Sequence, residues 1–401
     1  MPLAMPLALV ADPTPPPVAD RPEGATAVLR TVLDHGPVGR GELSRRTGLS
    51  PAAVSRYSAD LVTLGLVREA AADREPARPG RPRIPLEIDT ARHLAAGVHI
   101  AGPWLTFALT DLCGRVVAHE RIAKPAGADA PWVAARLPGF LRRHAGGRSV
   151  LGVGAVTGGW VDPVLGTVVE NAAIGWRGVA LRQELERTTW LPVHVEGHAH
   201  ALAQAECLFG AARGTDLVHL FVGNVVDAAI VAGATPLRGR RNGAGGIAHL
   251  PVPGSTERCP CGAVGCLQAT VSDRAVAARA VADGVIDRPD VLLLLAAARD
   301  GDARALDLCR TRLRLLAGAV SLLLDLINPQ ALVLTEAVTV YLPELLPELH
   351  AAVAARGTRA GEDVVRVGSF GTDTLAVAAA APVLAAVHQD PLGLRTARSA
   401  R

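Results

Sequence analysis

The strongest constraint on the fold is a regular alternation of apolar runs after residue 90. Short runs rich in Val, Ala and Leu, with the length of buried strands, alternate with longer segments of helical periodicity. This alternation predicts an α/β architecture, and the turn residues of segment 110–116 (TDLCGRV) add an expected hairpin. The strand-like runs are 93–100, 104–112, 148–156, 191–197, 217–224, 228–235, 331–337 and 364–370, and the helix-like runs are 132–144, 182–190 and 303–327.

Size and charge limit the class of protein. With 401 residues, of which 49% are hydrophobic and 20% charged, the chain has material for one large core or for two or three domains. The formal charge of +3 is too small to indicate nucleic-acid binding by itself, and Lys124 is the only lysine among many arginines. A DNA-binding function must therefore rest on a local segment.

The two ends of the chain and its hydropathy predict a cytoplasmic protein without membrane contact. Residues 1–24 have an apolar start and repeated prolines but no basic segment, so we expect a disordered leader and not a signal peptide. No uncharged run reaches the roughly 18–20 apolar residues of a membrane span, and the nearest, around residue 320, is broken by Asp325. Residues 389–401 are expected to form a flexible tail.

Residues 25–90 have the pattern of a winged helix-turn-helix DNA-binding domain. An amphipathic helix begins at Ala25 and ends at Gly36, and a short second helix ends before Gly48. Ser50 is then an expected N-cap, with Pro51 at the first position of a third helix. The inward side chains of this third helix are expected to be Val54, Tyr57, Leu61 and Leu64.

The outward positions of the third helix suit recognition of a DNA major groove. Arg56 is the main candidate for base contact, and Arg45 and Arg46 at the end of the second helix are candidates for phosphate contact. The predicted contact set of the helices also includes Ser50, Ala52 and Ser55. Segment 64–88 predicts a two-stranded wing whose tip carries Arg78, Arg81 and Arg83, which suit a minor groove. The alternative for this arginine cluster is a solvated linker.

Three of the six cysteines lie within eight residues, which indicates a metal site in a chain without a secretion signal. Cys259, Cys261 and Cys266, together with His249, are a set of three thiolates and one imidazole suited to tetrahedral Zn²⁺. Four protein ligands leave no open position, so the predicted zinc is structural. Gly262 and Gly265 permit the tight turn that this spacing demands, and the alternative is three buried cysteines without a metal.

The segment HVEGHAH at 194–200 contains three histidines but is a poor metal site. His194 is expected on a strand, while His198 and His200 open the following helix. Residues two apart on a helix do not share a face. We therefore expect no independent metal centre at this segment.

The segments GAGGIAHLPVPG (243–254) and CPCGAVGCLQ (259–268), with the helix-turn-helix head and its GRPR linker, resemble the ROK family of repressors, open reading frames and kinases. The likeness covers about residues 25–385. It implies an actin-like ATPase fold of two α/β lobes around a cleft for residues 91–388, preceded by the DNA-binding domain at 25–90. The kinases of this family bind a sugar and ATP in the cleft, and its repressors commonly keep the sugar site to sense an inducer.

The residues that match the family's kinase motifs differ from those motifs. The aspartate of the first phosphate loop corresponds to His99, and the aspartate that serves as catalytic base corresponds to His198. Two sugar ligands correspond to Ala173 and Gly246, and the adenine-side Gly-Gly pair corresponds to segment 335–338 (TEAV). The resemblance therefore predicts no kinase activity, no ordinary hexose at the family site and no catalytic residue. His99 and His198 are candidate cleft residues for a ligand, although space-filling is the simpler role.

The leading functional hypothesis is a homodimeric transcriptional regulator, most simply a repressor, that reads a palindromic operator in double-stranded DNA. The alternatives are a ligand-gated, sugar-responsive repressor, a regulator without a small-molecule effector and a sugar kinase with a fused head. His99, His198 and Gly246 disfavour the kinase. The sequence does not choose between an unknown small-molecule effector and none.

Overall fold

The computed structural model describes residues 23–70, 84–233, 235–358 and 364–394, which form a head and two lobes. The head contains α1 (Glu23–His35), α2 (Arg40–Thr47) and α3 (Pro51–Leu64), followed by β1 (Val67–Glu69) and β2 (Leu86–Ile88). β1 and β2 pair antiparallel, as expected for the strands of a wing. The leader 1–22 and the wing tip 71–83 lie outside the described residues.

Lobe I is built on a five-stranded sheet in the order β10-β6-β3-β4-β5. Its strands are β3 (His93–Ile100), β4 (Trp104–Thr110), β5 (Val116–Ala123), β6 (Ser149–Thr157) and β10 (Val193–Gly197). The predicted hairpin at 110–116 joins β4 to β5, which pair antiparallel, whereas β3, β6 and β10 are parallel. This lobe also contains α4 (Ala130–Ala134), α5 (Leu137–His144), α6 (Leu181–Thr189) and the small sheet of β7 (Trp160–Asp162), β8 (Thr167–Asn171) and β9 (Trp176–Val179).

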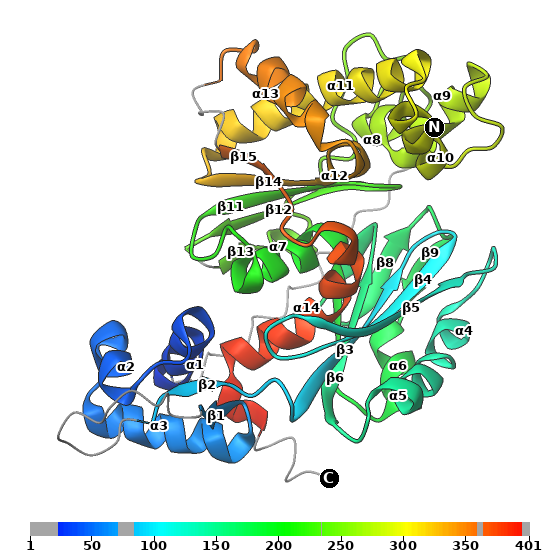
Figure 1. The fold of residues 1–401 in the computed structure, drawn as a ribbon. Coiled ribbons are helices and arrows are strands. Elements are labelled where there is room, and N and C mark those ends of the chain that lie inside the picture. Colours follow the sequence, from blue (N-terminus) through cyan, green and yellow to red (C-terminus); the bar gives the residue numbers. More distant parts are fainter. Residues whose placement is uncertain (1–22, 71–83, 234, 359–363, 395–401) are drawn as a thin grey trace, which may run out of the picture.

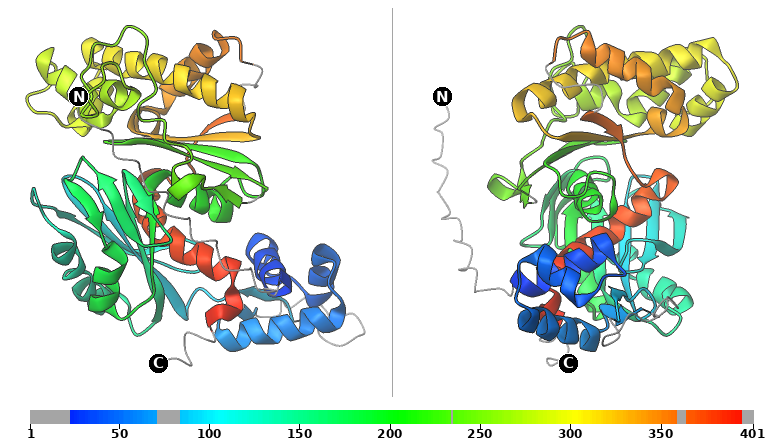
Figure 2. Two further views of the ribbon diagram at one scale, coloured as in Figure 1. Left: turned by 180° about the vertical axis from the view of Figure 1, so that it is seen from behind. Right: turned by 60° about the vertical axis from the view of Figure 1, so that its left-hand side comes forward.

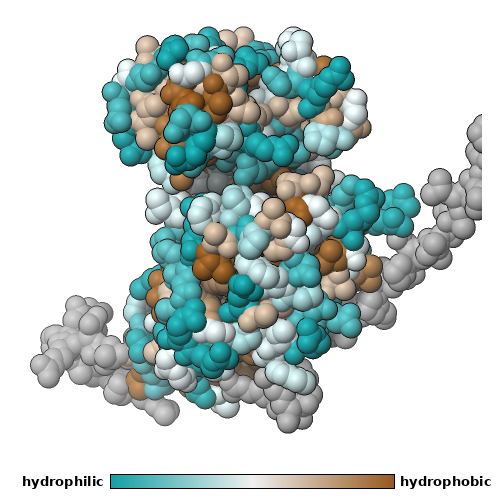
Figure 3. Space-filling view, turned by 90° about the vertical axis from the view of Figure 1, so that its right-hand side faces the viewer, coloured by the Kyte–Doolittle hydropathy of each residue, from teal (hydrophilic) through white to brown (hydrophobic). Residues whose placement is uncertain are grey.

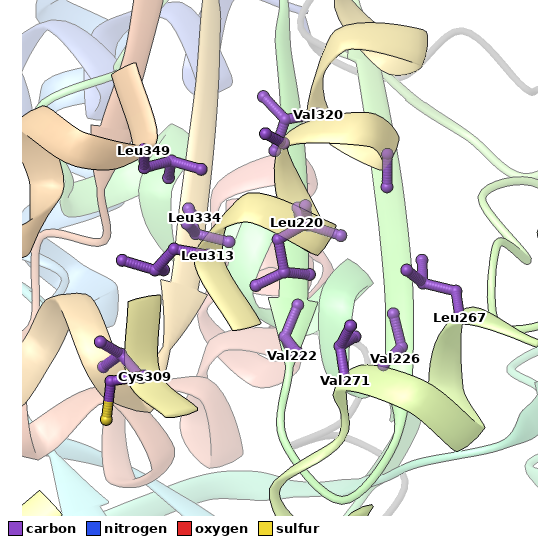
Figure 4. Close-up of a cluster of buried hydrophobic side chains, with 14 of the residues drawn as sticks. Leu220, Val222, Val226, Leu267, Val271, Cys309, Leu313, Val320, Leu334 and Leu349 are labelled. Carbon is purple, nitrogen blue, oxygen red and sulfur yellow. The ribbon is translucent and has the colours of Figure 1, made fainter. Parts of the chain in front are cut away.

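Lobe II is built on a second five-stranded sheet in the order β13-β12-β11-β14-β15. Its strands are β11 (Leu217–Val222), β12 (Val226–Ala232), β13 (Thr235–Leu237), β14 (Ala331–Glu336) and β15 (Val365–Val367). One face is covered by α8 (Leu267–Val271), α9 (Asp273–Ala282), α10 (Val291–Arg299), α11 (Ala303–Ile327), α12 (Ala337–Tyr341) and α13 (Leu346–Ala354). Figure 4 shows the resulting core, in which Leu220 and Val222 of β11 lie among side chains of α8 and α11.

Two helices, α7 (His198–Phe209) and α14 (Thr374–Gln389), lie between the two sheets. α14 packs on β3, β4 and β6 of lobe I and on α7, and α7 packs on β11 and β12 of lobe II. The approach of α14 to lobe I is close, because a Cβ atom on Gly154 would lie 2.0 Å from the carbonyl oxygen of Ala379. Glycine is therefore required at this position of the strand.

The window Gly371–Gln389, which includes α14, is the one stretch among the described helices that is long and apolar enough to cross a membrane by length and composition. The sequence pattern alone points instead to the apolar run around residue 320. In this window 72% of the residues are buried inside the protein, so packing between the lobes accounts for its apolar character. After α14, Pro391–Gly393 form a short 3-10 helix, and Leu392 and Leu394 pack against the core. Ordered structure thus extends beyond residue 389.

The head is joined to the body by a shared hydrophobic core. Val28 and Leu29 of α1 and Leu61 of α3 belong to the same buried cluster as Val383 and Leu384 of α14. Polar contacts reinforce this junction: Arg30 donates to the carbonyl oxygen of Cys207 at 2.6 Å, and Thr26 donates to that of Gln389 at 3.0 Å. Figure 2 shows the head beside the end of α14, remote from lobe II.

Candidate DNA-binding surface, metal cluster and lobe junction

The start of α3 is defined by a local capping arrangement. Gly48 ends α2 with a left-handed φ of 71°, which turns the chain toward α3. The Oγ atom of Ser50 accepts a hydrogen bond from the Ala53 amide at 3.2 Å, and Pro51 occupies the first turn. The predicted N-cap and the predicted start of the third helix are confirmed. In this cap the Ser50 oxygen only accepts, so the hydroxyl proton remains available for donation to another group.

The outward face of α3 presents small side chains and one arginine. Ala52, Ser55 and Arg56 are exposed, and the Arg56 guanidinium lies 4.8 Å from the centre of the Tyr57 ring without an acidic partner among the described residues. Val54, Leu61 and Leu64 are buried as predicted. The prediction for Tyr57 was only partly correct, because this ring is half-buried and Ser58 takes the fully buried position.

The two arginines at the end of α2 are paired within the head. Both Arg45 and Arg46 form ion pairs with Glu42, the second at 2.7 Å. Both arginines remain exposed, with 72% and 44% of their side-chain surface accessible. A phosphate would therefore compete with Glu42 for these two side chains. Arg78, Arg81 and Arg83 lie outside the described residues, so their role stays a prediction.

The four predicted metal ligands lie together. The donor atoms of His249, Cys259, Cys261 and Cys266 are all within 4.8 Å of one another, so this group could hold a metal ion. The Cys259 sulfur lies 3.6 Å from His249 Nδ1, and the Cys261 and Cys266 sulfurs lie 3.7 Å apart. Tetrahedral zinc, with Zn–S bonds of about 2.3 Å and Zn–N bonds of about 2.0–2.1 Å, requires separations of about 3.6 Å and about 3.8 Å. The cluster therefore fits such an ion.

Local backbone structure brings these ligands together. The Cys259 amide donates to the carbonyl oxygen of Ala263 at 2.9 Å, which closes a tight turn, and Gly262 has a φ of 94° that only glycine adopts readily. An isolated bridge pairs Pro251 with Cys266. Burial, with the neighbouring thiols, raises the pKa of Cys266, so a metal ion that binds here must displace a proton.

His99 and His198 form a buried stack at the junction of the two lobes. His99 is near the end of β3 and His198 begins α7, and their ring centres are 4.4 Å apart with an angle of 20° between the planes. Phe221 of β11 contacts His198 edge-on at 4.9 Å. Burial lowers the pKa of His99 to about 4 and, together with His99, lowers that of His198, so both rings are neutral near pH 7.

A polar network that sequence reasoning missed lies beside this stack. Glu196, at the end of β10, is 2% exposed and accepts from Arg238 at 2.8 Å and from Asn242 and Gln204 at 3.3 Å each. Arg238 and Asn242 come from the segment after β13, so these contacts join lobe II to lobe I. Burial raises the pKa of Asp227 on β12 to about 8, with Glu196 as a smaller cause. A single basic residue in a loop carries no sequence signal for such a pairing.

Two segments that the family resemblance aligns with nucleotide motifs form hydrogen bonds within the protein. Between β3 and β4 the Ala101 amide donates to the Trp104 carbonyl oxygen at 3.0 Å, and Pro103 in this turn has no amide proton for a phosphate. At the end of β14, the carboxylate of Glu336 caps α12 by accepting from the amides of Val338 and Thr339.

A buried arginine accompanies this cap. Arg312 of α11, whose side chain is 0% exposed, lies 3.4 Å from Glu336 and 2.8 Å from Asp273, and donates to the Val222 carbonyl oxygen at 3.1 Å. This network was also missed, because its members come from four distant parts of the chain. Glu336, in the segment that the family resemblance aligns with the adenine-side motif, is thus bonded to other groups of the protein.

A helix-turn-helix head, two α/β lobes and a His-Cys₃ cluster together define a DNA-binding regulator built on a kinase-like domain. The ROK family model matches residues 95–381, and the model of the IclR helix-turn-helix domain matches residues 25–71. The chain belongs to the ROK family. This agrees with the family resemblance and with the predicted two-lobed actin-like fold.

Similar proteins include regulators and kinases. A transcriptional regulator of Mycobacterium tuberculosis is 33% identical over 398 residues, covering 94% of this chain and 89% of the relative. The dual regulator NagC of Escherichia coli is 25% identical, covering 84% and 86% of the two chains. The crystal structure of a ROK regulator homologous to the E. coli MLC protein matches with a TM-score of 0.77 at 24% identity, covering 93% and 98%. A Streptomyces griseus ROK glucokinase matches with a TM-score of 0.64 at 27% identity, covering 72% and 98%.

Proposed function

We propose that the protein is a homodimeric transcriptional repressor that binds a palindromic operator through α3 and does not phosphorylate sugars. The observation that carries the proposal is the exposed face of α3, which starts at the Ser50 cap and presents Arg56 without an acidic partner among the described residues. Small side chains at Ala52 and Ser55 allow the helix to approach base edges closely. The names of the relatives, which include repressors, support this assignment.

The absence of kinase activity is supported by the lobe junction. The position of the catalytic base has a neutral imidazole stacked on His99, and the low pKa makes it a poor acceptor for a sugar proton. Glu336, in the segment aligned with the adenine-side motif, caps α12 and lies 3.4 Å from Arg312, so its carboxylate is already engaged. We therefore expect neither ATP nor an ordinary hexose to bind with the geometry of a kinase.

The metal of the His-Cys₃ cluster is proposed to be structural Zn²⁺. Its four ligands leave no position for a substrate, and the cluster links loop 257–266, which leads into α8, to His249. The ion would cross-link this loop. It would take no part in a reaction, because all four of its ligands come from the protein. With a DNA operator as its partner, the protein is proposed to act in the cytoplasm.

A ligand-gated repressor is the second candidate. It is favoured by buried polar atoms near the lobe junction that lack hydrogen-bond partners among the described residues, namely Gln204 Oε1 and His200 Nε2. Such atoms favour a polar ligand or ordered water. A repressor without an effector would leave them to water alone.

The test is selection of DNA sequences by the full-length protein. We expect an enriched palindrome whose affinity falls about tenfold or more in Arg56→Ala. Arg142→Ala changes an exposed arginine on α5, remote from the head, and is the matched control that should bind as the unmodified protein does. No enrichment, or an equal loss in both variants, would refute the DNA-binding assignment.

The kinase alternative is tested separately. Purified protein is incubated with ATP, Mg²⁺ and a panel of hexoses, and ADP release is measured. We expect release no faster than without sugar. Adding the same sugars and their phosphates to the DNA-binding reaction separates the two repressor models, because only a gated repressor is released by a compound.

A further inference from the structure

A cavity of about 460 Å³ that is open to solvent lies in lobe II between the metal-cluster loop, α8, α9 and the turn from β11 to β12. We propose that this cavity binds a small organic anion that has an apolar body, such as an aryl or alkyl carboxylate or phosphate. We infer the anionic group and the apolar body from the two kinds of side chain that line the cavity, one polar or charged and the other apolar. The lining residues all belong to lobe II, and none comes from the DNA-binding head.

The apolar half of the cavity is formed by one face of α9. Ala275, Ala278 and Ala282 follow one another at helical spacing and all line the cavity, so the small side chains leave it hollow. Pro260 of the metal-cluster loop and Pro289 after α9 add apolar surface at its edges. A cavity of this volume has the size of a small-molecule site.

The polar half of the cavity is rich in donors. Arg258, Arg274 and Arg279 line it together with Glu257, so the lining carries three positive charges and one negative charge, a balance of +2. Only Arg279 is paired with Glu257, at 2.9 Å, while Arg258 and Arg274 have no ion pair among the described residues. Two free guanidinium groups at one cavity favour a carboxylate or phosphate.

An amide group adds to these donors. The Oε1 atom of Gln268 accepts from the Val226 amide at 3.1 Å, which fixes the side chain and leaves its NH₂ group as the free end. An NH₂ group can only donate, so it also suits an anion. The donors thus come from three elements, the metal-cluster loop, α8 and α9.

The wall that carries Arg258 is held by backbone contacts. Arg258 pairs with Val264 in an isolated bridge, and the Gly265 amide donates to the Glu257 carbonyl oxygen at 2.8 Å. Cys259 and Cys261 of the metal cluster flank Pro260 in the same loop. A site on such a supported loop loses little freedom when a ligand binds.

The other two functional regions do not explain this cavity. On another face of α9, Asp273 pairs with Arg312 and Val276 belongs to the lobe II core. In Figure 1 α9 lies at the far end of the molecule from α3, so DNA bound by the head would not reach it. Figure 3, which views the molecule from the side on which α9 lies in Figure 1, shows only small separated hydrophobic groups on this face, not an extensive apolar surface for a protein partner.

Calorimetric titration of the full-length protein with phenyl phosphate, benzoate and 2-naphthalenesulfonate at low salt tests the proposal. We expect at least one of them to bind saturably with one molecule per chain, more tightly than inorganic phosphate. The variant with both Arg258→Gln and Arg274→Gln should weaken this binding about tenfold or more. Ala278→Leu should weaken it by narrowing the cavity along α9, and it should fold, because Ala278 is exposed on a helix and leucine is a good helix former.

Arg288→Gln is the matched control, because Arg288 is an exposed arginine close in sequence to Pro289 that does not line the cavity. Its binding should equal that of the unmodified protein. Failure of all three probes to bind saturably would overturn the proposal. So would equal loss in Arg288→Gln, which would mean unspecific charge attraction, or undiminished binding in Ala278→Leu, which would place the probe elsewhere.

Discussion

Several buried histidines in this protein are neutral side chains that fill space. His99 and His198 stack on each other at the lobe junction, at positions that the family resemblance aligns with aspartates of the kinase motifs. His219 of β11 is also fully buried, and neither of its ring nitrogens has a hydrogen-bond partner among the described residues. Such rings keep the interior uncharged at neutral pH, and this has a consequence for stability in acid.

Stability should fall as the pH drops below about 6.5, in part because of His219. Burial lowers the pKa of His219 to about 3, so the unfolded chain binds a proton there over a range in which the folded protein does not. Between the ordinary pKa of 6.5 and about 3, each pH unit costs about 1.4 kcal/mol through this one group. His219→Leu should therefore show a shallower fall in the urea-derived free energy of unfolding from pH 7 to pH 5.

His35 is exposed and provides the control for this measurement. His35→Leu should retain the pH slope of the unmodified protein. An equally steep slope in His219→Leu would show that His219 does not contribute. Leucine has no buried nitrogen atoms that need hydrogen-bond partners. We therefore expect His219→Leu to lose no hydrogen bond at pH 7.

The buried Arg312 network allows a comparison between two arginines of one helix. Arg312→Ala leaves Asp273 and Glu336 without their cation, and removing one partner of a buried pair costs about 3–5 kcal/mol. Arg310, two residues earlier, pairs with Glu348 on the surface, and Arg310→Ala should cost less than about 1 kcal/mol. Denaturant unfolding of the two variants measures both values, and similar costs would contradict the assigned burial.

At the scale of elements, the metal cluster is expected to hold loop 257–266 in place. Cys261→Ser removes one of the four ligands and should reduce bound zinc from about one equivalent per chain to substoichiometric levels. It should also lower the Tm by about 5 °C or more, because metal binding contributes to folding. Metal analysis and thermal melting are the measurements. Cys113→Ser lies outside the cluster and should change neither. An unchanged Tm in Cys261→Ser would contradict the structural role of the metal ion.

An element could be predicted from the sequence when its residue pattern was strong. The helix 303–327 matches α11 at both ends, because Asp302 caps its start and its apolar residues keep a helical spacing. Strand 93–100 matches β3 because a buried strand is apolar throughout. By contrast, α14 has so many alanines that no face stands out, and β7–β9 are too short to carry a period.

The same reasoning applies to the candidate sites. The His-Cys₃ cluster could be predicted because its three cysteines lie within eight residues and their chemistry is distinctive, and the Ser50 cap because it is local. The contacts of Glu196 with Arg238, and those of Arg312, join residues that are far apart in the chain. Ordinary charged residues at such separations carry no local signal, so these networks required the structure.

At the scale of the whole molecule, α14 connects three units. It follows β15 of lobe II, packs on the sheet of lobe I and ends in the core of the head. α7 runs from the His99–His198 stack to Cys207, whose carbonyl oxygen accepts from Arg30 of α1. A change in the arrangement of the lobes would therefore move the surfaces on which the head rests.

Because the head shares its core with α14, it should unfold together with lobe I and not as an independent domain. Leu384 is fully buried in this shared core, and Leu384→Ala should cost about 2–5 kcal/mol at the junction. Weakening only this contact should split the unfolding seen by calorimetry, with the head melting before the lobes. Leu326→Ala, at a leucine of α11 that is 70% exposed, should leave the profile unchanged. If Leu384→Ala instead shifts the whole profile without splitting it, head and lobe I form a single unit whose cooperativity does not depend on this contact, and motion of α14 could not release the head alone.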